Sequence, residues 1–404
     1  MQQTRLHALD AIRGIALLLG LLLHGSMSFW PGLDSFGYPI SDNSKSMTLT
    51  YMFYVLHMFR MAVFFLIAGF FAHLSLARKG PREFVKDRLK RIALPMVIAF
   101  IISLLLIAPI ALWAASKFYG PDYLDALLVY QQSAPAQPLL MHFWFLYYLL
   151  WFYALAVLCS FILEKLDPGD SLMNKVTELI YFSCKYRFMV ILATGVSAWL
   201  FFSRVDWYFW AGIPTPTEAV WKEAPAFIIY GMAFFLGWIF DRQRDCFVVL
   251  KSHWPQYLCL ALLTTGFSIT RLNPVPFVLL DIPGTDKLIY ALSYSLASWC
   301  WIFALTGAGL QYFDKENALR RYLADASYWI YIAHIPLLLF LQTLLMDVPW
   351  HWSIKFPLIL LISSALLLWT YDRWVRYTII GTTLNGVRQK KHEQGQSQST
   401  NIDL

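Results

Sequence analysis

The chain has 404 residues, of which 58% are hydrophobic and only 14% are charged, with a formal net charge of +7. A typical soluble domain carries about 25% charged residues, so this composition excludes a soluble enzyme, a disordered protein and a secreted disulfide scaffold. It indicates an all-α polytopic membrane protein, long enough for about ten membrane-spanning helices of roughly 20 residues.

Hydropathy predicts where these helices lie along the chain. The first apolar stretch has no small-residue cleavage site and runs directly into His24 and Trp30, so we expect a retained helix and not a signal peptide. The ten expected spans are 12–29, 50–76, 92–115, 139–162, 187–203, 224–240, 247–269, 288–310, 327–346 and 354–371.

Basic residues are distributed unevenly between alternate loops. If the N-terminus is cytoplasmic, 23 Lys and Arg residues lie in the cytoplasmic segments or at the span ends next to them, and seven lie on the outer side. Arg13 and Arg60, in the first two spans, are counted separately. Lys and Arg are retained on the cytoplasmic side of a membrane. We therefore expect both termini in the cytoplasm, and the positive charge reflects topology and requires no nucleic-acid partner.

No second domain is expected. The only low-complexity stretch is the polar tail at 388–404, for which we expect disorder. No CxxC or other metal-ligand spacing occurs, so no metal site is expected. No disulfide is expected either, because all five cysteines fall in expected helices or cytoplasmic loops: Cys159, Cys184, Cys246, Cys259 and Cys300.

The first span carries ionisable residues, which are costly in a bilayer and usually functional. Arg13 and His24 are eleven residues apart, so both project from one face of a helix, about 16 Å apart along its axis. Arg13 is expected near the cytoplasmic surface, with Asp10 as its i, i+3 partner, and His24 toward the outer leaflet. A snorkelling Arg and a capping His would explain each residue singly, but not their alignment.

The second span places His57 and Arg60 on one face, at the depth expected for His24 in the neighbouring helix. The aromatic pair Phe64-Phe65 follows, so the pattern predicts a polar pocket in an apolar wall. Histidine is the usual group that removes a hydroxyl proton in acyl transfer. His24, His57 and Arg60 are therefore candidate catalytic residues, and the alternative is a purely structural hydrogen-bonded cluster.

A basic loop follows the second span and ends with Arg88, Lys90 and Arg91. On its own, such a loop most often only marks the cytoplasmic side of the membrane, according to the positive-inside rule. Beside Arg13, it would form a cationic mouth suited to a polyanionic ligand such as the nucleotide end of coenzyme A. These four basic residues are candidate donor-binding residues, because phosphates held there would let a flexible arm carry its thioester toward His24.

Two later histidines are candidate substrate-binding residues. His142 and Trp144 open the fourth span from the outer side, where an acceptor would arrive, or they form an ordinary aromatic anchor at the interface. His334 follows Tyr331 one to two turns from the inner end of the ninth span, and it could instead bond carbonyl groups freed by Pro336.

At these residues the chain resembles the membrane acyltransferase family 3 over nearly its whole length, 1–387. One departure is Ala68, where family members usually have Ser. The matching motifs are Leu9-Asp10 with Arg13 and His24, Phe64-Phe65 with Gly69-Phe70, Arg88 and Arg91 before Pro95, His142 with Trp144, and Tyr331 with His334 and Pro336.

Within that family, the stretch 57–65 is most similar to the branch of glucan biosynthesis succinyltransferases. The resemblance implies a multi-pass protein of the inner membrane of a Gram-negative bacterium. It implies transfer of succinyl groups from cytoplasmic succinyl-CoA to a periplasmic glucan, with acyl-CoA as donor substrate and no permanently bound cofactor. Arg60 offers a partner for the second carboxylate of a succinyl group.

Other functions also have to be considered. A proton-coupled transporter should have intramembrane carboxylates and a repeated hydropathy pattern, and the expected spans contain no Asp or Glu. A non-catalytic scaffold would leave the register of Arg13 and His24 unexplained. An acyltransferase of the same family acting on another glycan or lipid fits the same motifs. Transfer could be direct, with a histidine base, or pass through an acyl-histidine intermediate.

Overall fold

The computed structural model describes residues 7–33, 40–125, 128, 140–205, 207, 209–214, 223–272 and 284–386. Within these ranges the chain forms helices, turns and loops, without a β-strand, so the expected all-α class is confirmed. The expected disordered tail at 388–404 lies outside the described residues.

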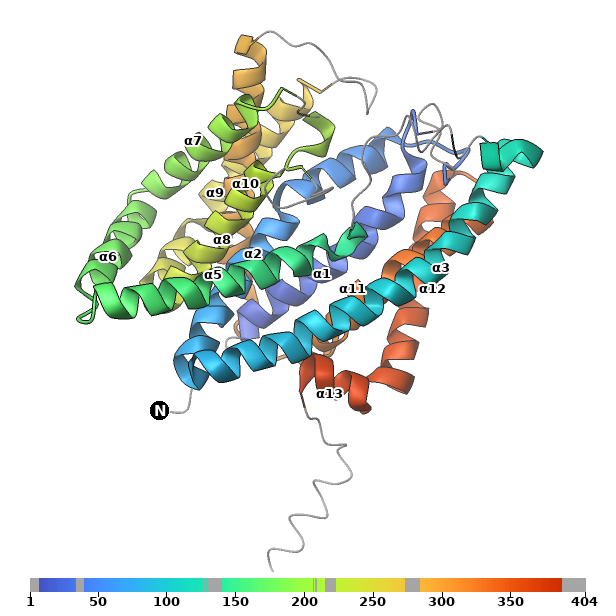
Figure 1. Ribbon diagram of the computed structural model, residues 1–404. Helices are drawn as coiled ribbons and strands as arrows, with labels where there is room; N and C mark the ends of the chain where they lie inside the picture. Colours follow the sequence, from blue (N-terminus) through green and yellow to red (C-terminus); the bar gives the residue numbers. More distant parts are fainter. Residues whose placement is uncertain are drawn as a thin grey trace, which may run out of the picture.

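The helices form a bundle whose members are tilted relative to one another (Figure 1). Short π-helices at Leu89–Ala93 and Tyr371–Val375 precede α3 and α13, and a 3-10 turn at Met141–Phe143 leads into α5. The α-helices are α1 His7–Ser26, α2 Met47–Arg88, α3 Leu94–Tyr119, α5 Trp144–Leu166, α6 Ser171–Lys185, α7 Phe188–Phe202, α8 Ala224–Arg242, α9 Asp245–Ile269, α10 Gly284–Tyr312, α11 Ala318–Leu345, α12 Trp352–Thr370 and α13 Ile379–Asn385.

Eight stretches of the described residues are long and apolar enough to cross a membrane. One of them, Met47–Asp125, has 79 residues, several times the length needed for a bilayer core of about 30 Å. It bends at Gly80, whose φ of 74° is not helical, and it contains the second and third expected spans as α2 and α3. Figure 1 shows these helices running in opposite directions from a turn at the lower end of the bundle.

The fifth expected span, 187–203, is shorter in the structure than a full crossing. α7 has 15 residues, which extend about 22 Å. It follows α6 at a bend of 96°, and the two helices pass the membrane test only as a pair. With this pair as one span, and with α2 and α3 counted separately, the described helices accommodate the ten expected spans. Helix α6 itself falls between expected spans.

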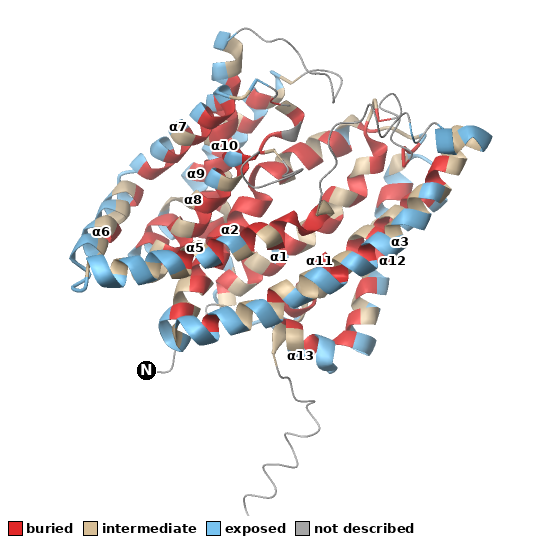
Figure 2. Cartoon of the chain, viewed as in Figure 1, coloured by how far each residue is buried: buried red, intermediate tan, exposed pale blue. Residues whose placement is uncertain are grey.

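Helix α2 lies in the interior of the bundle and packs against α1, α5, α8 and α10. Figure 2 shows buried residues concentrated along α1 and α2, and exposed residues on α3 and α6. Helices α2 and α8 approach closely at two glycines: a Cβ on Gly69 would overlap the Phe234 carbonyl, and a Cβ on Gly237 would overlap the Leu66 carbonyl. Small residues at such crossings let backbones meet, so these glycines fix the position of α2.

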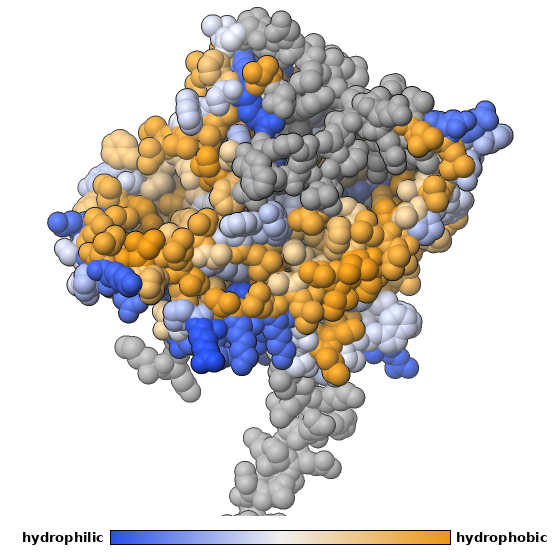
Figure 3. Space-filling view, viewed as in Figure 1, coloured by the Kyte–Doolittle hydropathy of each residue, from blue (hydrophilic) through white to orange (hydrophobic). Residues whose placement is uncertain are grey.

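The outer surface of α3 carries aliphatic side chains such as Ile98, Ile101 and Leu105. Figure 3 shows a hydrophobic surface across the middle of the molecule and a hydrophilic one at its lower end. A helix that is apolar on its exposed face fits a lipid environment. One cavity at this lower end is lined by Arg13, Arg88 and Arg91 together with the last residues of α13. By the positive-inside rule, we expect this end to face the cytoplasm.

A buried ion pair fastens the loops at the opposite, outer end. Lys355 at the start of α12 is fully buried, and its ammonium donates hydrogen bonds to the Asp42 carboxylate at 2.7 Å and the Asn43 side-chain oxygen at 3.0 Å. It also donates to the Val348 carbonyl at 2.9 Å. The segment before α2 is thereby joined to the connection between α11 and α12, beside the outer cavity described below.

Candidate active site

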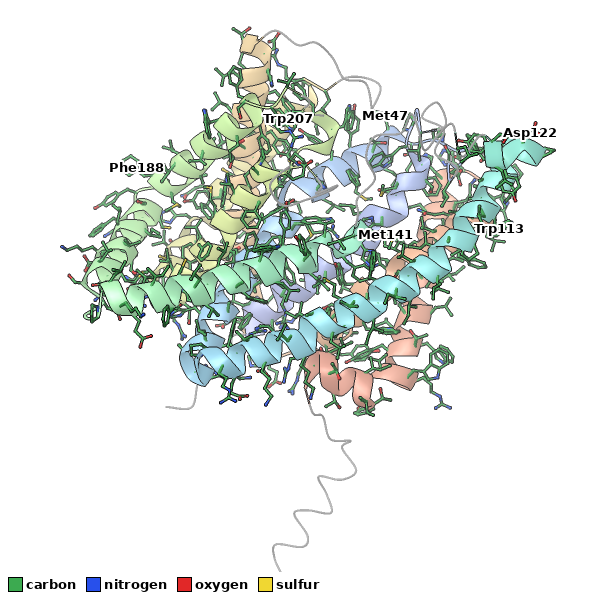
Figure 4. All side chains as sticks on the ribbon, viewed as in Figure 1. Met47, Trp113, Asp122, Met141, Phe188 and Trp207 are labelled. Atoms are coloured by element: carbon green, nitrogen blue, oxygen red, sulfur yellow. The ribbon has the colours of Figure 1, made fainter. Side chains whose placement is uncertain are left out.

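Two cavities lie within the bundle, one toward each side of the membrane. The inner cavity, of about 270 Å³, lies among α1, α2, the π-helix Leu89–Ala93, α5, α11 and α13. The outer cavity, of about 380 Å³, lies among α1, α2, α3, the turn before α5 and α11. Figure 4 shows Met141, which lines the outer cavity, well below Met47 and Asp122 at the outer ends of α2 and α3. The outer cavity therefore reaches into the membrane-spanning part of the bundle.

Three of the four predicted donor-binding residues line the inner cavity. Arg13 comes from α1, Arg88 from the end of α2 and Arg91 from the π-helix. The intervening Lys90 is exposed and is not among the described residues that line this cavity. π-helical turns occur frequently at functional sites. This one presents Arg91 to the cavity, next to Arg88 from the last residue of α2.

Aromatic and acidic neighbours position the arginines of the inner cavity. The Arg13 guanidinium lies 3.2 Å from the Asp10 carboxylate, the pairing expected from the i, i+3 spacing. Arg88 lies over the rings of Phe84 and Tyr153, at 4.7 and 4.9 Å from their centroids. Such cation–π contacts restrict a guanidinium without neutralising its charge, so Arg88 remains available to an anionic ligand.

The other predicted site residues converge on the outer cavity. They come from four separate segments of the chain: α1, α2, the turn that leads into α5, and α11. The residues are His24, His57, Arg60, His142, Trp144, Tyr331 and His334.

His334 occupies the centre of a histidine cluster. Its ring centroid lies 5.2 Å from that of His24 and 5.2 Å from that of His142. Its Nδ1 lies 2.7 Å from the carbonyl oxygen of Tyr331, and the Tyr331 hydroxyl donates a hydrogen bond to the His142 carbonyl at 2.7 Å. These bonds join α11 to the turn before α5 within the cavity wall.

The expected depth of His334 was wrong, whereas for His142 the structure decides between the two alternatives. Helix α11 begins at Ala318, nine residues before the expected span, so His334 lies more than four turns into the helix and at the level of His24. His142 is buried and its ring contacts Tyr331 and His334. It is therefore not an interfacial anchor, because the turn at Met141–Phe143 begins inside the bundle.

Arg60 carries a buried positive charge toward the outer cavity. The described lining residues of this cavity include no Asp or Glu, and Arg60 forms no ion pair with a described residue. Its Nη1 lies 2.5 Å from the position that a Cβ on Gly20 would occupy, so the glycine makes room for the guanidinium. Burying an uncompensated charge is costly, and an anionic ligand group would remove this cost.

An aromatic contact separates the two cavities. Phe64 lines the inner cavity and Phe145 lines both. Phe65 packs against Phe145 with ring centroids 5.1 Å apart. The cavities are therefore adjacent, and Phe145 belongs to the lining of both.

Phe145 and Gln342 are among the lining residues of the outer cavity that were not predicted from the sequence. Gln342 donates hydrogen bonds to the backbone carbonyls of His24 and Gly25, both at 3.1 Å, and so holds the end of α1 against α11. An amide about two turns after His334 in an apolar span was a usable signal. Phe145 gave none, because it lies in a run of aromatic residues.

The family comparison covers most of the chain. The family profile described as an acyltransferase domain matches residues 6–369. The glucans biosynthesis protein C of Escherichia coli SMS-3-5 is 24% identical over 344 residues, which are 83% of each chain. The protein of the same name from Escherichia coli K12 is 23% identical over the same length. No solved structure gives a significant match. The chain belongs to acyltransferase family 3, as its motifs predicted, and is a multi-pass membrane acyltransferase.

Proposed function

We propose that this protein transfers a succinyl group from cytoplasmic succinyl-CoA to hydroxyl groups of a periplasmic glucan, across the inner membrane of a bacterium. The observation that carries the proposal is the pairing of two cavities. One, at the expected cytoplasmic end, is lined by three arginines. The other, toward the outside, is lined by four histidines and by Arg60, which forms no ion pair with a described residue.

The inner cavity is suited to the nucleotide end of the donor. Arg13, Arg88 and Arg91 present guanidinium groups to one space, and guanidinium groups bind phosphate through paired, charge-assisted hydrogen bonds. Lys90 would add positive charge at the exposed rim. The flexible arm of coenzyme A would then extend past Phe145 and bring its thioester into the outer cavity.

The outer cavity selects the acyl group through Arg60. The second carboxylate of a succinyl group would neutralise this buried guanidinium, for which the described lining residues offer no partner. An acetyl group would leave the charge unpaired, at a cost in binding. A proton-coupled transporter requires carboxylates within the membrane, and the described residues that line this cavity include none.

The histidine cluster supplies the proton chemistry. In this proposal His24 and His57 lie beside the thioester. A neutral imidazole of the cluster removes the acceptor's proton, and Arg60 stabilises charge that develops on the carbonyl oxygen. Trp144 and Tyr331, with His142 and His334, form the wall against which a sugar would lie. The name of the Escherichia coli relatives supports a glucan as acceptor.

The test compares donors with the purified full-length protein. Wild type should transfer radiolabelled succinyl from succinyl-CoA to a glucan oligosaccharide faster than it transfers acetyl from acetyl-CoA. Arg60→Met, which removes the charge at similar volume, should lose that preference, while Arg271→Met at an exposed outer position should keep it. Envelope glycans from cells that contain the protein should carry added succinyl mass. Absence of acyl transfer from any acyl-CoA, or an unchanged donor preference in Arg60→Met, would refute the proposal.

A further inference from the structure

His334 is the most enclosed ring of the histidine cluster, with 2% of its surface exposed. Its ring lies between those of His24 and His142, at 5.2 Å from each. A group in this position can exchange protons with its neighbours while remaining shielded from bulk water. The hydrogen bonds of its two ring nitrogens therefore decide what it can do.

One hydrogen bond defines the tautomer of His334. A carbonyl oxygen only accepts hydrogen bonds, so the 2.7 Å contact between Nδ1 and the Tyr331 carbonyl requires a proton on Nδ1. In the neutral ring Nε2 then carries the lone pair. Nε2 is buried and has no hydrogen-bond partner among the described residues. It is a proton acceptor whose orientation is fixed by the backbone of its own helix.

The neighbouring histidines lack this arrangement. Both ring nitrogens of His142 are buried without a hydrogen-bond partner in the described part of the chain. The ring of His24 has no hydrogen bond to a described residue that would define its tautomer, although its backbone carbonyl accepts one from Gln342. In this cluster, the His334 ring is held by a 2.7 Å bond to a backbone carbonyl.

Nε2 of His334 also lies near Arg60. The position of a Cβ on Gly20 would be 3.9 Å from His334 Nε2 and 2.5 Å from Arg60 Nη1. Both nitrogens therefore border one small region beside α1. A substrate whose anionic or carbonyl oxygen contacts Arg60 places its reacting atoms within reach of His334.

We propose that Nε2 of His334 is the catalytic base of the transfer, an inference that rests on the proposed function and identifies its proton acceptor. The acceptor hydroxyl oxygen attacks the thioester carbonyl and forms the new C–O bond while Nε2 takes the hydroxyl proton. Collapse of the tetrahedral intermediate breaks the C–S bond, and the imidazolium returns the proton to the departing thiolate. The products are the ester and free CoA, and His24 is the adjacent proton carrier.

The first test uses the full-length protein in lipid nanodiscs with radiolabelled succinyl-CoA and a glucan oligosaccharide. The Asn amide in His334→Asn can still donate to the Tyr331 carbonyl but offers nothing at the position of Nε2. Turnover should fall about 10²–10⁴-fold with unchanged donor affinity, and added imidazole should restore part of the turnover of His334→Ala. The matched control is His253→Asn, because His253 makes a similar contact of 2.9 Å with the Val249 carbonyl outside both cavities. This control should retain wild-type turnover.

The inference would be overturned if His334→Asn kept more than a tenth of wild-type turnover. It would also be overturned if imidazole restored turnover to His24→Ala and failed to restore it to His334→Ala. A second readout does not depend on the substrate. In protein labelled with 15N-histidine, the NMR shifts of the two ring nitrogens of His334, assigned by comparison with His334→Asn, should show a neutral ring with its proton on Nδ1. A proton on Nε2, or a ring that is always charged, would also overturn the inference. An Nδ1-protonated His334 in a wild-type protein that transfers no acyl group would support the available base and count against the proposed function alone.

Discussion

The ring of Phe145 meets the ring of Phe64 edge to face, with centroids 4.4 Å apart and planes at 90°. Phe64 lines the inner cavity and Phe145 lines both. The thioester arm of a donor bound in the inner cavity would therefore have to pass this contact to reach the outer cavity. We expect a rotamer change of Phe145 to open a passage between the two cavities. The closed contact also keeps water of the outer cavity away from an unreacted thioester.

Replacing Phe145 by Leu should therefore uncouple thioester cleavage from transfer. The smaller side chain leaves a gap between the cavities, and water can reach the donor when no acceptor is bound. We expect release of free CoA in the absence of glucan to rise several-fold, measured as thiol appearance with succinyl-CoA. Phe152→Leu is the control, because Phe152 packs against Phe65 with centroids 5.2 Å apart and lines neither cavity. Equal rates in the two variants would show that the Phe64–Phe145 contact is not a barrier.

Donor affinity should depend on the arginines of the inner cavity. Arg13→Ala and Arg91→Ala each remove a charge-assisted contact, typically about 1.5–3 kcal/mol, so the Kd for succinyl-CoA should rise about 10- to 100-fold. Added salt should weaken wild-type binding as well, because phosphate recognition at an open mouth is screened. Isothermal titration calorimetry would measure both effects. Arg82→Ala removes a charge from the same basic segment, which is helical in the structure and not a loop as expected, at an exposed position outside the cavity. An equal loss of affinity in this variant would mean that the basic residues only set the topology.

The elements that local geometry determines could be predicted from the sequence. The eleven-residue spacing places Arg13 and His24 on one face of α1 because helical periodicity alone sets that angle, and the two side chains do line neighbouring cavities. The pairing of Asp10 with Arg13 follows from the same periodicity.

What depends on tertiary packing could not be predicted. The position of His334 beside His24 requires α11 to begin at Ala318, where charged residues hide the start of the helix from hydropathy. The entry of His142 into the bundle requires the turn at Met141–Phe143 to lie below the outer surface. Hydropathy reports whether a segment is apolar, but not how deep it starts or what it faces.

A single methyl group at Gly20 should separate activity from stability. Alanine is favoured over glycine in a helix interior by up to about 1 kcal/mol, yet the new Cβ would lie 2.5 Å from Arg60 Nη1 and displace the guanidinium. Gly20→Ala should therefore fold with an unchanged or higher Tm, while succinyl transfer falls at least about tenfold, the equivalent of one lost polar contact. Gly195→Ala in α7 is the matched control, because nothing lies within 4 Å of its Cβ position. Full activity in Gly20→Ala would mean that the position of Arg60 does not limit the reaction.

The buried pair of Asp42 and Lys355 should make the stability of one variant depend on pH. Burial raises the pKa of the Asp42 carboxyl above its usual value, and the Lys355 ammonium opposes part of this rise. Lys355→Met leaves the carboxyl buried without its partner, a change that typically costs about 3–5 kcal/mol. A carboxyl whose pKa is higher in the folded than in the unfolded protein contributes stability below its unfolded pKa, and this contribution is lost as the pH rises through the folded pKa.

The Tm of Lys355→Met should therefore fall below that of wild type by less at pH 5 than at pH 8, because Asp42 can remain protonated at the lower pH. Tm followed by tryptophan fluorescence in detergent measures this difference. The double variant Asp42→Asn with Lys355→Met has no buried carboxyl left to ionise, so its deficit should be smaller and independent of pH over this range. A Lys355→Met deficit that is equal at both pH values would mean that the Asp42 carboxylate finds water or another cation when the lysine is removed. The loop that borders the outer cavity would then be held by its backbone contacts, such as the 2.8 Å hydrogen bond from the Asp42 amide to the Ser28 carbonyl.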